Sequence, residues 1–174
     1  MTAKRSGISL APIKEMKQTI TILIFLIISL SGFATWQEPD LLIYKGDTIQ
    51  INVFPLEILM DKDSSLRRKF LNQNCGSTDC WRMHIGIWKI ENDSLFLIGL
   101  KDCCYNKPIP ISEIFDNLSV KNNAVFAIWF TDSFKSGFGK ILKFNEEKWE
   151  DEFEYYLELN ILNGKVVKYS STKK

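Results

Sequence analysis

The chain has 174 residues, of which 22 are basic, 21 are acidic and one is histidine, so its formal net charge is only +1. With 45% hydrophobic, 13% aromatic and 25% charged residues, the composition excludes a disordered, collagen-like or coiled-coil chain, and the length suits one domain. The near-zero charge gives no reason to expect a nucleic-acid partner.

The N-terminal segment has the pattern of a secretory signal peptide. Residues 20–30 (ITILIFLIISL) are uncharged and follow a basic flank. Gly32 and Ala34 place small residues at the −3 and −1 positions of a cut after Ala34. A transmembrane helix needs roughly 20 apolar residues, and the run over residues 20–34 has only about 15. We therefore expect cleavage, and no stable membrane span after it.

The start of translation is expected at Met16. Residues 16–19 form a signal n-region of ordinary length, whereas residues 1–15 have no pattern of their own. Residues 1–34 are then the signal peptide, and residues 35–174 form one exported β domain in the periplasm or outside the cell. Removal of residues 1–34 takes away four basic residues and one acidic residue, which changes the net charge from +1 to −2.

The mature chain begins with a predicted hairpin and a helix. Residues 41–44 and 48–53 are two strand patterns around the turn Lys45-Gly46-Asp47, and Pro55 ends the second strand. Residues 63–72 predict one short amphipathic helix, because apolar residues recur there at helical spacing.

Three further pairs of strands follow, each joined at a turn: residues 81–90 with 94–101 at Asn92-Asp93, 124–131 with 138–144 across a loop at 132–137, and 153–161 with 165–170 at Asn163-Gly164. In the register set by Asn92-Asp93, Trp88 lies opposite Leu97, and Gly86 lies opposite Gly99. About eight strands in sequential hairpins with one short helix predict an all-β fold. An antiparallel β-sandwich and a small barrel fit this pattern equally well.

Four cysteines bracket the central hairpin: Cys75, Cys80, Cys103 and Cys104. An even number of cysteines in an exported domain is typical of structural disulfides. The hairpin register places Cys80 and Cys103 on one face and points Cys104 toward the loop that carries Cys75. We therefore expect the disulfides Cys80–Cys103 and Cys75–Cys104. A four-thiolate zinc site and a vicinal Cys103–Cys104 disulfide are the alternatives, but adjacent residues rarely bind one metal ion. We expect no metal and no cofactor.

The charged candidates for catalysis have structural interpretations. His84 is the only histidine, and no nucleophile motif accompanies it, so we expect it to be a structural residue of its strand. Six carboxylates between Glu146 and Glu154 suggest a calcium site or paired glycosidase acids. The spacing of an EF-hand is missing, and a solvated acidic loop is the expectation.

Exposed aromatic side chains are the better candidates for a binding contact. Phe134 and Phe138 flank the predicted loop at 132–137, Trp149 lies in the acidic segment, and Tyr156 lies on the polar side of its strand. Aromatic residues supply large contact areas, and loops held by a sheet often carry function.

Three short segments carry a resemblance: residues 76–82 (GSTDCWR), residues 125–130 (VFAIWF) and Gly139-Lys140. Together they resemble a set of uncharacterised exported β-rich proteins of Bacteroidetes, over most of the mature chain. The resemblance implies a location in the cell envelope. It implies no known activity, so it transfers no functional residue.

These observations favour a non-enzymatic binding or interaction domain of the cell envelope. Its partner would be an unknown protein, a glycan or a small apolar ligand. The alternative is a hydrolase with an unrecognised carboxylate site. An enzyme needs acids that converge in a concave pocket, so the arrangement of the carboxylates distinguishes the two.

Overall fold

The computed structural model describes residues 36–71, 75–116, 120–146 and 150–174, together with Ile20. The chain divides into two compact units, Met1–Thr35 and Trp36–Lys174, and the second contains the folded elements discussed below. The predicted signal peptide, the start at Met16 and the contact candidate Trp149 lie outside the described residues.

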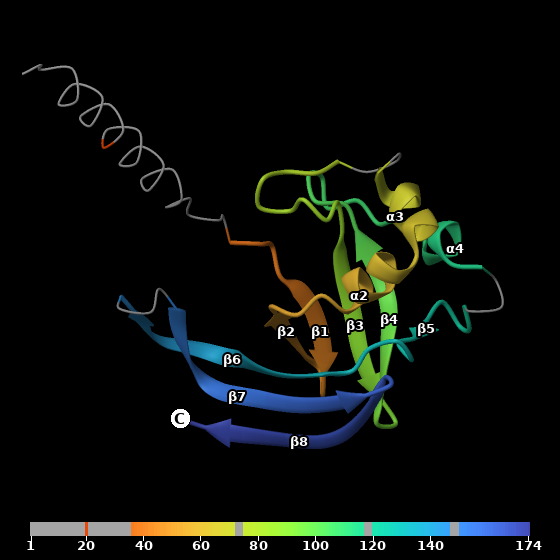
Figure 1. Cartoon of the computed structure of the whole chain (residues 1–174). Helices are drawn as coiled ribbons and strands as arrows, with labels where there is room; N and C mark the ends of the chain where they lie inside the picture. Colours follow the sequence, from red (N-terminus) through yellow and green to blue (C-terminus); the bar gives the residue numbers. More distant parts are fainter. Residues whose placement is uncertain (1–19, 21–35, 72–74, 117–119, 147–149) are drawn as a thin grey trace, which may run out of the picture. The chain divides into compact units, whose positions relative to one another are not determined.

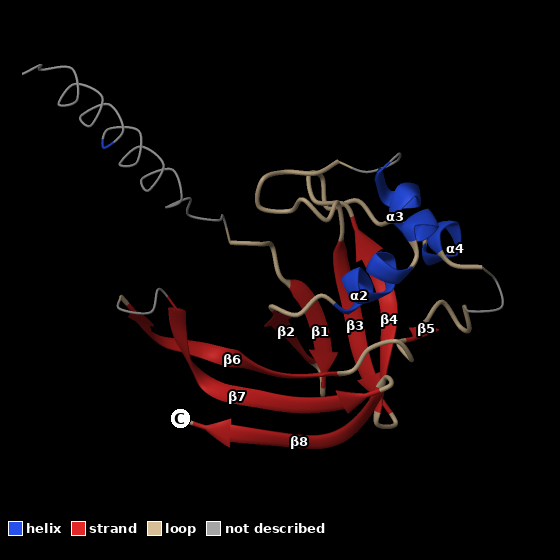
Figure 2. Ribbon diagram, in the orientation of Figure 1, coloured by secondary structure: helices blue, strands red, loops and turns tan. Residues whose placement is uncertain are grey.

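The described part of the second unit contains eight strands and three short helices (Figures 1 and 2). In chain order these are β1 (Asp40–Tyr44), β2 (Asp47–Ile51), α2 (Pro55–Lys62), α3 (Ser64–Leu71), β3 (Ile85–Glu91), β4 (Ser94–Lys101), α4 (Ile111–Ile114), β5 (Val125–Phe126), β6 (Asp132–Asn145), β7 (Glu150–Leu162) and β8 (Lys165–Lys173).

All eight strands belong to one mixed sheet. Its order is β2-β1-β3-β4-β8-β7-β6, and β5 pairs with β4 beside this path. Every pair is antiparallel except β1 with β3, because the chain makes α2 and α3 between these two strands. The sheet curls until its outermost strands, β2 and β6, lie close to each other, so it is nearly closed into a barrel. The prediction of a mostly β fold is therefore confirmed, although one strand pair is parallel.

Three of the four predicted hairpins are present, namely β1–β2, β3–β4 and β7–β8. Asn92 and Asp93 have φ angles of 49° and 51°, which is the left-handed conformation that a tight two-residue hairpin requires. Trp88 lies opposite Leu97 as expected. The register then shifts by one residue between Ile87 and Trp88, so Gly86 faces Leu100 and the predicted pairing of two glycines is wrong.

The predicted hairpin across residues 132–137 is also wrong. Strand β6 runs through these residues without a break and pairs with β7, while β5 is only two residues long and pairs with β4. The small and polar residues of this stretch suggested a loop. They form a strand because Phe134, Ser136 and Phe138 alternate with exposed positions at an edge of the sheet, where polar side chains reach water.

The described part of the second unit has three short helices, where one was predicted. Helix α3 is the expected one, and Asp63, just before its first turn, accepts a hydrogen bond at Oδ1 from the Ser65 N–H at 2.9 Å. Helix α2 begins at Pro55, which was interpreted as the end of a strand or the mark of a strand at a sheet edge. Proline suits the first helical position, because the N–H that it lacks would have no partner there.

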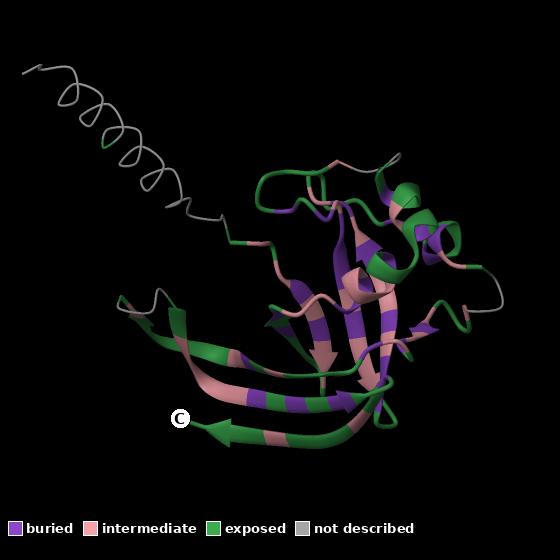
Figure 3. Ribbon diagram, in the orientation of Figure 1, coloured by how far each residue is buried: buried purple, intermediate pink, exposed green. Residues whose placement is uncertain are grey.

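The core lies between the helices and the inner face of the curled sheet. Trp88, Leu42 and Leu157 are fully buried in it, and the half-buried Trp129 donates its indole N–H to the Pro55 carbonyl at 2.8 Å. Figure 3 shows the buried residues concentrated in β1, β3, β4 and the end of β7 next to β8. The far half of β6 and most of β8 are exposed.

Two disulfides connect the segment before β3 to the segment after β4. They join Cys75 to Cys104 and Cys80 to Cys103, with Cα–Cα distances of 5.7 and 5.9 Å. This is the pairing that the hairpin register favours, and it leaves no free cysteine among the residues that the structure describes. Two disulfides indicate an oxidising, non-cytoplasmic compartment.

Candidate functional site

A cleft of about 590 Å³ lies where the outermost strands of the sheet approach each other. We call it the β2–β6 cleft. Its walls come from the segment before β1, from the end of β2, from the middle of β6 and from the first half of β7. It exists because β6 has 14 residues and β2 only five, so β6 and β7 continue past the end of β2 (Figure 1).

Aromatic side chains form much of the cleft lining. They are Trp36, Phe144, Phe153 and Tyr156. Trp36 is 63% exposed, and the rings of Phe153 and Tyr156 are perpendicular, with centres 6.5 Å apart. The Phe153 ring lies across Gly137 of β6, where any Cβ would come within 2.0 Å of that ring. Glycine at this position therefore allows Phe153 to reach into the cleft.

Three carboxylates also line the cleft: Glu38, Glu150 and Asp151. All three are exposed, and no ion pair joins them to a basic residue within the described ranges. Their neighbours in β7 differ, because Glu152 pairs with Lys143 and Lys174, and Glu154 pairs with Lys173. The described part of this acidic segment from Glu150 onward is a strand and not the solvated loop that the sequence predicted.

Lys135 is the basic residue among those that line the cleft. Its Nζ lies 4.9 Å from the centre of the Tyr156 ring and 3.6 Å from Glu158 Oε1. One ammonium group thus faces three carboxylates, so the described part of the cleft lining carries a net negative charge.

The predicted contact residues occupy different places. Tyr156 lines the cleft, as an exposed contact requires. Phe134 and Phe138 are half-buried and pack against the core, and Phe138 stacks on Tyr155 with ring centres 5.4 Å apart. Neither phenylalanine lies in a loop, because β6 contains both, so the predicted loop is wrong, whereas their role as contact residues stays a prediction.

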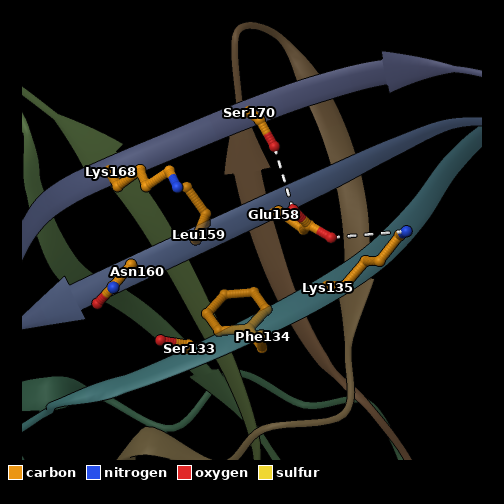
Figure 4. A pocket seen from close by; sticks show the side chains of 8 residues that line it. All are labelled: Ser133, Phe134, Lys135, Glu158, Leu159, Asn160, Lys168 and Ser170. Atoms are coloured by element: carbon orange, nitrogen blue, oxygen red, sulfur yellow. Dashed lines mark hydrogen bonds and ion pairs between the residues drawn. The ribbon is translucent and has the colours of Figure 1, made fainter.

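A second pocket, of about 350 Å³, lies over β6, β7 and β8 (Figure 4). Phe134 contributes to its lining. Glu158 accepts a hydrogen bond from the Ser170 hydroxyl at 3.3 Å and pairs with Lys135 (Figure 4). The carboxylate of this pocket is therefore already paired within the protein, unlike the three carboxylates of the β2–β6 cleft within the described ranges.

A buried ion pair holds the segment that carries Trp36. Arg82 donates from Nη1 to Asp40 Oδ1 at 2.8 Å and from Nη2 to the Glu38 carbonyl, and both side chains of the pair are fully buried. The Glu38 N–H also donates to the Asp79 carbonyl, at 2.6 Å. The disulfide-linked segment before β3 thus fixes residues 38–40, and with them one wall of the cleft.

Asp40 receives two further hydrogen bonds, from the Gly86 N–H at 3.0 Å and from the Trp88 indole N–H at 2.9 Å. Burial raises the pKa of Asp40, and the Arg82 guanidinium acts in the opposite direction. Three donors converge on the carboxyl oxygens, so we assign the charged form. A Cβ at Gly86 would lie 2.6 Å from Asp40 Oδ2, which explains the glycine in this strand.

His84 is fully buried beside this ion pair, and burial together with the Arg82 charge lowers its pKa to about 3. Its Nδ1 lies 2.8 Å from the Arg82 carbonyl, which can only accept, so Nδ1 carries the proton. Nε2 then has a lone pair and no partner, 3.9 Å from Glu57 Oε1, which also has no partner. Burial raises the pKa of Glu57, in opposition to Arg67. His84 is thus a neutral structural residue away from the cleft.

Sequence reasoning missed Trp36, Phe144, Phe153 and Glu38 as a group, because only the curl of the sheet brings them together. It also missed the Asp40–Arg82 pair. An available signal was Arg82 between Trp81 and an apolar strand, since an arginine in such a place needs a carboxylate partner.

No group of three or more metal-binding side chains is present in the described part of the chain. None of the helices in that part is both long enough and apolar enough to cross a membrane. We found no protein-family model, no curated protein and no solved structure that matches this chain.

Proposed function

We propose that this protein is an exported, disulfide-braced binding module, located in the periplasm or outside the cell, which holds a partner in the β2–β6 cleft and catalyses no reaction on it. The observation that carries the proposal is a cleft of about 590 Å³ in which aromatic rings face the same space as carboxylates that have no ion-pair partner among the described residues. Binding clefts typically combine an apolar lining with a few convergent polar groups, over about 300 to 1,000 Å³.

The support of the cleft also suits a binding module. Two disulfides, the Asp40–Arg82 pair and the hydrogen bonds of Glu38 hold the wall that carries Trp36. A wall fixed before the partner arrives costs little ordering entropy on binding.

The test is capture of partners from the native envelope and medium on immobilised protein. Trp36→Ala should abolish capture, because it removes an exposed wall of the cleft. Trp81→Ala is the matched control, since Trp81 is also exposed, at 55%, and does not line the cleft. Equal capture by the wild type and both variants would contradict a binding role for the cleft.

A hydrolase is the second candidate, because three carboxylates line a concave surface. Glycosidases use two carboxyl groups on opposite sides of the scissile bond. If the wild type cleaves any of a panel of nitrophenyl glycosides, and Glu150→Gln or Asp151→Asn abolishes this without unfolding the protein, the hydrolase replaces the binding module.

A further inference from the structure

We infer that the β2–β6 cleft takes up a lysine or arginine side chain from a basic segment of a protein partner, held between aromatic rings and carboxylates. This inference rests on the proposed function and adds the chemical class of the partner. It is carried by the geometry of the rings, by the charge of the cleft and by the way in which the protein holds its own lysines.

The aromatic rings of the cleft suit a cationic side chain. The rings of Phe153 and Tyr156 meet at 89°, and Trp36 lines the same cleft from another segment of the chain. Phe153 and Tyr156 thus pack edge to face, and together with Trp36 they bring aromatic rings from three residues into one cleft. An ammonium or guanidinium group is attracted to the face of such a ring.

The charge of the cleft also favours a cationic partner. Glu38, Glu150 and Asp151 have no ion-pair partner among the described basic residues, although lysines neutralise the next carboxylates along β7. A neutral glycan would gain no charge interaction with these groups. An apolar ligand would have to desolvate them, which is unfavourable. A cationic side chain instead supplies their missing partner.

The protein already binds ammonium groups with this combination of ring and carboxylate. Lys135 Nζ lies 4.9 Å from the centre of the Tyr156 ring and 3.6 Å from Glu158. Lys173 Nζ lies 5.4 Å from the centre of the Tyr155 ring and 3.1 Å from Glu154. The cleft offers the same two kinds of group in excess of its single described lysine.

The experiment measures binding of a fluorescein-labelled hexalysine peptide to the purified, oxidised protein by fluorescence anisotropy. Hexaglutamate, an uncharged glycine-serine peptide and chitohexaose serve as comparison probes. We expect binding of hexalysine alone, with an affinity that falls as the salt concentration rises.

Two matched pairs of variants locate the binding. Glu150→Gln with Asp151→Asn should weaken hexalysine binding by about tenfold or more, whereas Glu91→Gln with Glu113→Gln, which removes the same charge elsewhere, should leave it within about twofold. Trp36→Ala should weaken binding by about tenfold, and Trp81→Ala should not change it. Circular dichroism spectra of all variants should match that of the wild type.

Each other outcome overturns the inference. If both double variants bind hexalysine equally, the peptide senses only the total charge. If chitohexaose or the uncharged peptide binds and depends on Trp36 while hexalysine does not bind, the cleft is a binding site for a different class of ligand. In that case the proposed function stands without this inference. If no probe binds and capture of native partners is also independent of Trp36, the proposed function fails with it.

Discussion

The short segment from Trp36 to Asp40 joins two regions that use the same kinds of side chain in opposite ways. At its end, Asp40 is fully buried and accepts hydrogen bonds from Arg82, Gly86 and Trp88. At its beginning, Trp36 and Glu38 are exposed and line the β2–β6 cleft. The buried carboxylate of Asp40 is therefore hydrogen-bonded to the indole of Trp88 inside the protein. A few residues before it, the carboxylate of Glu38 and the indole of Trp36 face the solvent.

The contrast between these two regions indicates where a functional site can lie in this domain. A buried charge must have its partner within the fold, because an unpaired one is very costly. An exposed carboxylate without an ion-pair partner lowers the stability of the fold very little, because water solvates it. It is therefore free to pair with a group from another molecule. The buried ion pair holds one wall of the cleft in place, and the cleft offers its rings and carboxylates to a partner. Variants that break one region and leave the other intact test this comparison.

The largest effect is expected from Arg82→Met, which leaves the carboxylate of Asp40 buried without its countercharge. We expect the free energy of unfolding to fall by about 3 to 5 kcal/mol, measured by urea denaturation. Lys89→Met is the control, since it breaks an exposed pair with Glu91 and should cost at most about 1 kcal/mol. A loss of similar size in both variants would mean that the buried pair does not anchor the fold.

Removal of the Cys80–Cys103 disulfide should have the next largest effect. The two cysteines are 23 residues apart, and replacement of both by alanine should lower the free energy of unfolding by about 3 kcal/mol through the gain in unfolded-chain entropy. The Cys75–Cys104 disulfide spans 29 residues and should contribute a similar entropic amount. Cys80 is also buried, so its replacement should cost more than that of the partly exposed pair.

How much of this could be predicted from the sequence depends on the range of the interaction. The turn at Asn92-Asp93 and the strands beside it are specified locally, so the central hairpin and, through its register, both disulfides were predicted. The register shift between Ile87 and Trp88 was not predicted, and neither was the way in which Asp40 and Trp88 fill the space beside Gly86. Asp40 comes from a distant strand, and no local pattern contains it.

The cleft could not be predicted from local sequence patterns, because its residues also come from distant parts of the chain. Tyr156 was identified because it lies on the polar side of an alternating strand, which is a local property. Trp36 precedes the first strand, and it lies in the same cleft as Tyr156 only because β2 and β6 meet at the opening of the barrel. Phe134 and Phe138 were placed in a loop because Gly137 resembles a turn residue. The ring of Phe153, which occupies the place of a side chain there, is the actual reason for that glycine.

A smaller effect concerns pH. The pKa of His84 is about 3 in the folded protein, against the ordinary histidine value of 6.5, so the unfolded chain binds a proton between these values and the folded protein does not. Stability should therefore be constant in this respect above pH 6.5 and fall as the pH drops toward 3, by up to about 1.4 kcal/mol per pH unit. The raised pKa of Glu57 acts with the opposite sign, because protonation there favours the folded state.

Denaturation of His84→Gln across the same pH range separates these contributions. Glutamine can donate a hydrogen bond to the Arg82 carbonyl but does not titrate, so the fall in stability on acidification should be shallower in the variant. Arg67 and Arg82 remain in place, and their charges are the same in both proteins. Parallel curves for the wild type and the variant would show that His84 does not titrate on unfolding, contrary to the prediction.

The smallest effect on stability, and the sharpest contrast between the two regions, is expected from two exposed tryptophans. Trp36 lines the cleft, whereas Trp81 lies next to the buried Arg82 and outside the cleft. Both are more than half exposed, so each replacement by alanine should change the free energy of unfolding by less than about 0.5 kcal/mol in urea. Binding should nevertheless differ between the two variants: Trp36→Ala should weaken it and Trp81→Ala should not, because Trp36 is the one of the two that lines the cleft. A loss of stability in Trp36→Ala that matches its loss of binding would instead make Trp36 part of the support of the fold, and Tyr156→Ala would then be the variant that reports on the cleft.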